Sequence, residues 1–169
     1  MITARSVNRV NEEIDGLTDE QLGEAIDRLF DAQPEVLPFL KSFSNRDGRI
    51  QELATLLSFF VFKVYETEYP GKAATVKRED LESVLDEAKS WIAELDRPEA
   101  RDNPPPESEP ILMAYLMKNL DTHLNSLDGE ARHAGYRQRV LLMMIKTIIL
   151  ALDRAAPFKA FHPIDTPEF

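Results

Sequence analysis

Two histidines and their acidic neighbours form the arrangement in this chain that comes nearest to a metal site. Glu130 and His133 have the Glu-x-x-His spacing of helical di-iron proteins, and Asp121 and His123 lie in the helix expected just before them. Di-iron sites need two such motifs and two further glutamates, whereas this sequence offers one motif, in the first turn of its helix. A metal-binding helical protein that uses His123, His133 and nearby carboxylates is therefore an alternative function. We assign no metal ligand and no cofactor.

A second pattern echoes the middle of a calcium-binding loop. Asn45, Asp47 and Gly48 have the spacing of the third and fifth ligands and the glycine of an EF-hand. The first and twelfth positions of that loop would be Phe43 and Ala54, and neither side chain can bind calcium. A turn before a helix explains these residues better.

One basic cluster stands out in an otherwise acidic protein, at the start of the last long helix. Arg132, Tyr136 and Arg139 share a helical face, and Arg137 is their neighbour. Guanidinium groups beside a tyrosine can hold a phosphate or carboxylate, so these four residues are candidate contacts for a partner or an anion. The alternatives are a solvated helix end and ion pairs with the acidic helix 81–95, in this chain or in a second copy.

Recognisable catalytic signatures are missing. The sequence has no glycine-rich phosphate loop, no Gly-x-Ser-x-Gly elbow and no His-Glu-x-x-His motif. It also has no cysteine, which excludes disulfides, thiolate metal sites and cysteine nucleophiles. The carboxylate pairs at 79–80 and 86–87 fall on a face expected to be exposed, where they make poor acid–base pairs. The sequence thus leaves enzymatic activity open but favours a protein that is not an enzyme, and we assign no catalytic residue.

The elements that must position these residues are helices, and two of them are unusually apolar. The run 140–152 is interrupted only by Lys146 and Thr147, and the run 50–68 is also too apolar for a single stripe. A helix that is apolar on all sides must be surrounded by protein or membrane, and the run 140–152 is shorter than the roughly 20 residues that cross a bilayer. The sequence thus predicts two largely buried central helices.

Further helices are indicated by spacing and by capping signals. Thr18 and Gln21 fit a capping box, Gly16 before them is expected to end a helix in a left-handed conformation, and prolines 34 and 38 restrict the next helix to a short or kinked one. Apolar residues recur at helical spacing over 81–95 with acidic residues between them, which predicts an outer helix. The fold class is all-α, a bundle of about five to seven helices.

The prolines between residues 97 and 110 indicate a stiff linker. We expect a single all-helical domain, 1–169, in which this linker separates an N-terminal helical part, 1–96, from a C-terminal helical hairpin, 111–156. The tail 158–169 holds three phenylalanines and is expected to lie against the body.

Charge narrows the range of partners. The net charge of −10 argues against nucleic acid and anionic membranes and favours a basic protein partner. Residues 1–15 contain no continuous apolar stretch, so no signal peptide is expected and the cytoplasm is the default location.

These observations lead to one preferred function and two alternatives. The preferred function is a non-enzymatic helical interaction or regulatory protein, homodimeric or with a basic partner, because apolar helix is plentiful and catalytic groups are missing. One alternative is the metal-binding protein described above. The other is a small-molecule sensor with an apolar pocket between the two central helices.

Overall fold

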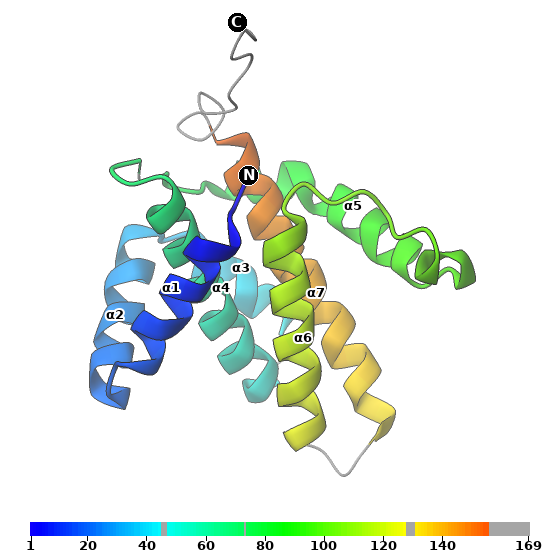
Figure 1. Ribbon diagram of the computed structural model, residues 1–169, viewed down its shortest axis with the longest axis horizontal. Coiled ribbons are helices and arrows are strands. Elements are labelled where there is room, and N and C mark those ends of the chain that lie inside the picture. The colour runs from blue at the N-terminus through cyan, green and yellow to red at the C-terminus, as the bar shows by residue number, and fades with distance from the viewer. Residues whose placement is uncertain (45–46, 73, 128–130, 156–169) are drawn as a thin grey trace, which may run out of the picture.

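The computed structural model describes residues 1–44, 47–72, 74–127 and 131–155, and for 125–127 and 131–134 it describes the backbone alone. Within these ranges the chain forms seven α-helices, one short 3₁₀ helix and no strand, so the expected all-α bundle is confirmed (Figure 1). The helices are α1 (Ala4–Asp15), α2 (Asp19–Ala32), α3 (Val36–Phe43), α4 (Gly48–Glu68), α5 (Arg78–Leu95), η1 (Pro98–Arg101), α6 (Pro110–Leu127) and α7 (Ala131–Arg154).

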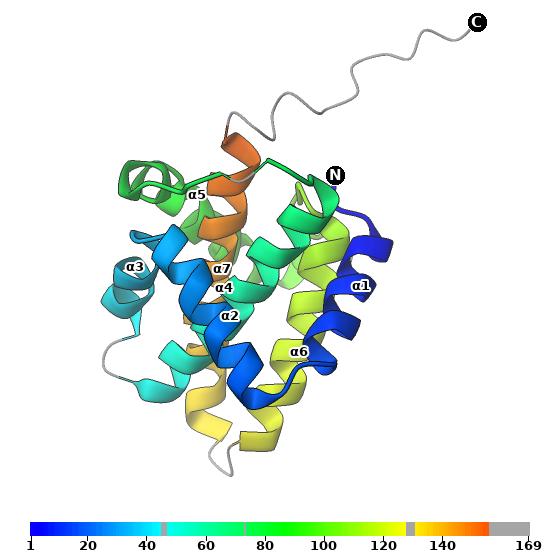
Figure 2. The ribbon, with the colours of Figure 1, turned by 90° about the vertical axis from the view of Figure 1, so that its left-hand side faces the viewer.

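The two apolar runs are the central helices of the bundle. Helix α7 contacts α3, α4, α5 and α6, and α4 contacts α1, α2, α3 and α7 (Figure 2). From 141 to 152 every α7 residue except Met143 is buried, and in α4 the whole stretch 58–62 is buried. The other helices surround this pair, which satisfies the demand that their apolar surface be covered.

Helix α5 is amphipathic, as its spacing predicts. Leu81, Val84, Ala88 and Trp91 are buried, mainly against α7, while the acidic residues 79, 80, 82, 86 and 87 are exposed. Figure 1 shows the C-terminal end of α5 and η1 extending away from the rest of the bundle. This part of the molecule therefore offers more surface than a helix packed along its full length.

Helix caps explain where α1, α2 and α4 begin and end. The predicted capping box is present: Gln21 N–H donates to Thr18 Oγ1 at 3.2 Å, and Thr18 N–H donates to Gln21 Oε1 at 3.0 Å. Asp47 caps α4 by accepting from the N–H groups of Arg49 and Ile50. The prediction that Gly16 adopts a left-handed conformation is wrong. Gly16 has φ −82°, because its N–H bonds back to the last turn of α1 in a right-handed conformation before Thr18 starts the next helix.

Pro34 and Pro38 shorten α3, as expected. Pro34 lies in the turn before the helix, and Pro38 falls within the first turn, where the missing N–H has no partner to lose. The result is an eight-residue helix. It exposes part of Phe39 and Phe43.

The Pro-rich segment begins with η1 and continues without regular structure through residues 104–109 to the start of α6. The division at this linker into two parts stays a prediction. The packing expected for the tail 158–169 lies outside the described residues. In the described part of the chain, no helix is long and apolar enough to span a membrane.

Candidate functional site

The basic cluster of α7 is held largely by ion pairs within the chain. Arg137 Nε lies 3.0 Å from Asp47 Oδ2, and a terminal nitrogen of Arg139 lies 3.0 Å from Asp96 Oδ1 at the end of α5. Tyr136 is 55% exposed, and the side chain of Arg132 lies outside the described residues. The structure thus separates the cluster: Arg137 faces α4 and Arg139 faces α5. Its role as a partner or anion contact stays a prediction.

A cleft of about 270 Å³ lies beside Arg139, between α5, α6 and α7. The Arg139–Asp96 ion pair is on its wall. The remaining lining is mostly apolar: Ile92, Leu95, Met117, Gly135, Gln138 and Leu142.

The histidine pattern is only partly described. His123 is exposed, and its Nδ1 lies 2.8 Å from the carbonyl oxygen of Asn119 one turn earlier. The side chain of His133 lies outside the described residues. Among the side chains that are described, no group of three or more His, Asp or Glu is placed to hold a metal ion.

Asp47, which the calcium-loop pattern singled out, is a helix cap. Burial opposes ionisation of its carboxyl group, but the bonds from Ile50 N–H, Arg137 and Arg49 N–H outweigh this and hold its pKa below the ordinary value. A carboxylate at a helix N-terminus is also stabilised by the helix dipole. This arrangement accounts for the Asp-Gly pair without a metal.

The most unusual chemistry in the fold surrounds Lys146, the one charged residue inside the apolar run of α7. Its side chain is 3% exposed, and its Nζ donates to Glu107 Oε1 at 2.5 Å. The same nitrogen lies 5.0 Å from the centre of the Trp91 ring, in cation–π range. Two buried atoms here, Trp91 Nε1 and Glu107 Oε2, have no hydrogen-bond partner among the described residues. The Lys146 ammonium is thus paired, but two polar atoms beside it lack a hydrogen-bond partner among the described residues.

Asp153 continues this polar cluster along α7. Its carboxylate accepts from Ser108 Oγ at 2.6 Å and from the hydroxyl of Tyr65 in α4. Burial raises the pKa of Asp153, and the charge of Glu107 adds to the effect, while Lys146 and the two hydroxyl donors oppose it. Burial also raises the pKa of Tyr65. Tyr65 therefore stays a neutral donor.

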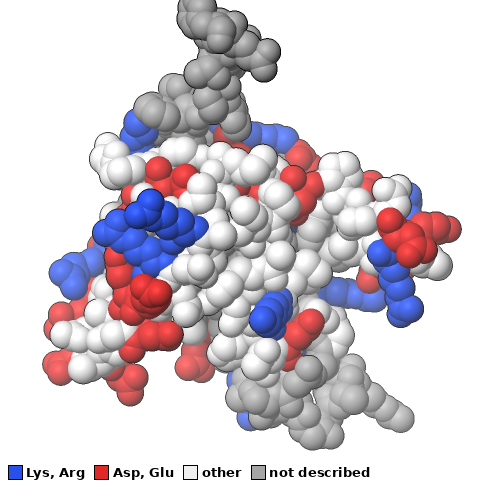
Figure 3. Space-filling view, viewed as in Figure 1, with Lys and Arg blue, Asp and Glu red and all other residues white. Residues whose placement is uncertain are grey.

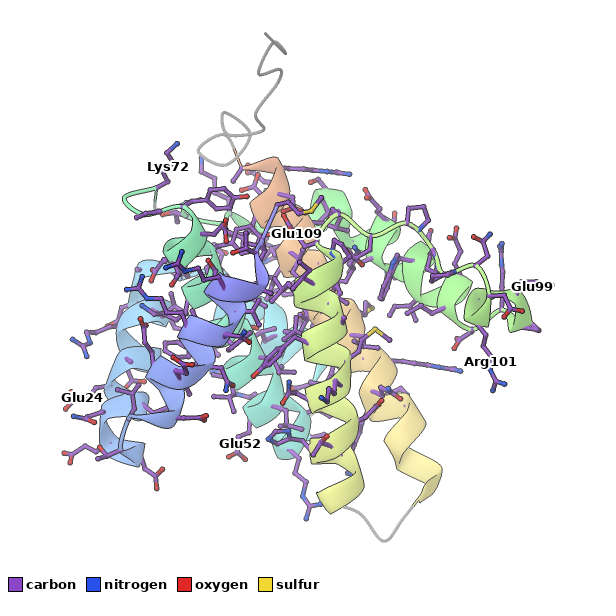
Figure 4. The ribbon with its side chains drawn as sticks, viewed as in Figure 1. Glu24, Glu52, Lys72, Glu99, Arg101 and Glu109 are labelled. Atoms are coloured by element: carbon purple, nitrogen blue, oxygen red, sulfur yellow. The ribbon has the colours of Figure 1, made fainter. Side chains whose placement is uncertain are left out.

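Glu109 completes the cluster and is almost fully buried, at 4% exposed. Its Oε2 accepts from the backbone N–H of Ile2 at 2.5 Å. Burial raises the pKa of Glu109, opposed by that bond and assisted by the charge of Asp153. Figure 4 shows Glu109 between the start of α1 and the start of α6, whereas Glu24, Glu52 and Glu99 project from the surface.

Sequence reasoning missed this cluster. The available signal was a lysine inside an apolar run, together with glutamates among prolines, since a buried ammonium requires a carboxylate partner. Spacing alone could not say which carboxylate, because Lys146 and Glu107 are separated by a whole helix.

A second cleft, of about 240 Å³, opens between α3 and α5, which lie side by side in Figure 2. Phe39 and Phe43 form an edge-to-face pair on its α3 side, with ring centres 5.0 Å apart. On the α5 side, Arg78 Nε and Glu82 Oε1 are 2.6 Å apart. The other lining residues are Glu35, Pro38, Ser42 and Leu85. Partly exposed aromatic rings beside charged groups are typical of protein interaction sites.

Comparison of the chain with protein-family models, curated proteins and solved structures found no match. The geometry is therefore the basis for a functional proposal.

Proposed function

We propose that this protein is a non-enzymatic interaction module whose α3–α5 cleft binds a basic segment of a partner protein. The observation that supports this most directly is the half-buried Phe39–Phe43 pair at the mouth of the cleft. Buried ionisable groups such as Glu109 and Lys146 bond inside the fold, which leaves them unsuited to act on a substrate.

The size of the cleft favours a protein side chain as its occupant. Pockets for small molecules usually measure about 300–1,000 Å³. At about 240 Å³ this cleft is smaller and suits one large apolar side chain. Such an anchor, packed against the Phe39–Phe43 pair, is how binding energy concentrates in a few residues at interfaces.

Charge supports a basic partner. The cleft is lined by two acidic residues, Glu35 and Glu82, and one basic residue, Arg78. Helix α5 also exposes the acidic residues 79, 80, 86 and 87. Figure 3 shows acidic and basic side chains gathered over α1 and α2, with a largely uncharged face over α6. With a net charge of −10, the molecule attracts a cationic partner over distances of about a Debye length.

A photocrosslinking amino acid at Ser42, which lines the cleft, tests the proposal in cells that make the protein. Ser83 is the matched control, because it is exposed on α5 and lies outside the cleft lining. We expect a protein adduct from position 42 and not from position 83, attached through a basic segment and lost in F39A/F43A. An adduct of twice 19.3 kDa would identify a second copy of this chain instead. That result, or equal labelling at both positions, contradicts the proposal.

A further inference from the structure

The segment 104–109, here called the strap, is attached to the body almost entirely by side chains. Between residues 104 and 108, its described backbone forms no hydrogen bond to another backbone group. Its three consecutive prolines lack N–H donors and keep it extended. Three successive side chains instead bond to the body: Glu107 to Lys146, the exposed Ser108 to Asp153, and Glu109 to the backbone N–H of Ile2.

The charges around this attachment do not balance. The strap supplies Glu107 and Glu109, α7 supplies Asp153 and Lys146, and α4 supplies Glu68. The cluster is also faced by the phenols of Tyr65 and Tyr69 and by the N-terminal amine. Helix α5 contributes Trp91. The start of α6 contributes no ionisable side chain. Four carboxyl groups thus share one lysine and the N-terminal ammonium, and, despite partial burial, bonds from Ser6 and Thr3 hold the pKa of Glu68 below its ordinary value. Ionising the more deeply buried Asp153 and Glu109 as well is costly.

We propose that the strap is proton-controlled: protonation of Asp153 and Glu109 fastens it onto α4 and α7, and their ionisation loosens it. A neutral carboxyl group keeps its hydrogen bonds to Ser108 or Ile2 without the cost of a buried charge. The raised pKa values of both groups agree with this direction. The inference is independent of the α3–α5 cleft, which lies on another part of the molecule.

Two atoms beside Lys146 that lack a hydrogen-bond partner among the described residues reduce the cost of opening the strap. Glu107 Oε2 and Trp91 Nε1 lose no protein hydrogen bond when the strap leaves, and both gain access to water. Opening also breaks the Glu107–Lys146 ion pair and the bonds that Ser108 and the Ile2 N–H donate, so the water gained by these two atoms offsets only part of the cost. The protonation states of Asp153 and Glu109 then add to or subtract from that cost.

Trp91 provides the readout, because it is the only tryptophan and lies against Lys146 beneath the strap. We would measure acrylamide quenching of Trp91, and hydrogen exchange of the Ile2 amide, which donates to Glu109 of the strap, corrected for its intrinsic rate, between pH 5 and 8.5. When closing the strap takes up one proton, the equilibrium constant for opening rises about tenfold per pH unit. This holds between the pKa of the linked carboxyl group in the open strap and its higher pKa in the closed strap. Quenching and exchange should therefore both increase with pH in the wild-type protein.

The D153N/E109Q variant removes both titrations and should flatten the two pH profiles. E99Q is the matched control, since Glu99 is an exposed carboxylate near the strap, and should behave as wild type. If the double variant fails to fold by circular dichroism, D153N and E109Q are measured singly, and each should reduce the slope. A flat wild-type profile, an unchanged slope in the asparagine and glutamine variants, or a slope lost in E99Q would overturn the proposal.

Discussion

Asp47 and Asp153 show how position decides what a carboxyl group does to stability. Asp47 caps α4 and pairs with Arg137, so its pKa is lowered. Asp153 is enclosed between α4, α7 and the strap, so burial raises its pKa despite two hydroxyl donors. Lowered and raised pKa values have opposite signs in the dependence of stability on pH.

The asparagine variants should show that opposition directly. Asp47 stabilises the fold above its ordinary pKa, and this contribution is lost as the pH falls through its lowered folded value. D47N should therefore be less stable than wild type near pH 7, by about 1 kcal/mol, with a difference that shrinks as the pH falls through the lowered pKa of Asp47.

The contribution of Asp153 is fully present below its ordinary pKa and is lost as the pH rises through its raised folded value. D153N does not titrate, so its stability should improve relative to wild type as the pH rises through the raised pKa of Asp153. Urea denaturation at each pH measures both effects. Parallel pH curves for D153N and wild type would contradict the assignment.

Lys146 gives a sharper test, because its side chain is nearly inaccessible. K146M leaves the Glu107 carboxylate buried without its cation, which typically costs about 3–5 kcal/mol. Adding E107Q removes the unpaired charge, so K146M/E107Q should recover much of that loss. If the double variant were no more stable than K146M, the loss of stability in K146M would not come from the unpaired Glu107 carboxylate.

At the scale of elements, the sequence predicts well wherever the signal is local. The capping box of Thr18 and Gln21, the short α3 and the amphipathic α5 depend on neighbours within one or two turns, and the structure has all three. The left-handed conformation predicted for Gly16 is wrong because a residue that ends a helix can remain right-handed when the N-cap of another helix follows two residues later. Contacts across the fold, such as Glu107 to Lys146, have no local signal.

The capping box permits a prediction at this scale. T18A removes the side-chain acceptor for Gln21 N–H and should lower the free energy of unfolding by about 1 kcal/mol. T75A is the control, because Thr75 is an exposed threonine in the loop before α5. Chemical denaturation compares the two variants, and equal stability for both would mean that α2 does not need its cap.

The molecule as a whole depends on the two central helices. Buried apolar side chains from all seven helices form one core around α4 and α7, which is the architecture that the two apolar runs predict. The clefts could not be predicted in the same way. They arise where α5 leaves the bundle and where Pro38 shortens α3, and such shapes depend on packing angles that composition does not specify.

Charge placed in the centre of α7 should therefore unfold the entire protein. Met144 and Ile148 are both fully buried, and an unpaired carboxylate at either position costs several kcal/mol, a large part of the roughly 5–15 kcal/mol that stabilises a typical domain. Y136D places the same charge on the same helix at an exposed position and should melt near wild type. Thermal denaturation followed by circular dichroism distinguishes the two cases. Lys146 tolerates burial in this helix because it pairs with Glu107, whereas the aspartate of M144D or I148D would have no such partner. A wild-type melting temperature in either variant would therefore mean that α7 is not the centre of the fold.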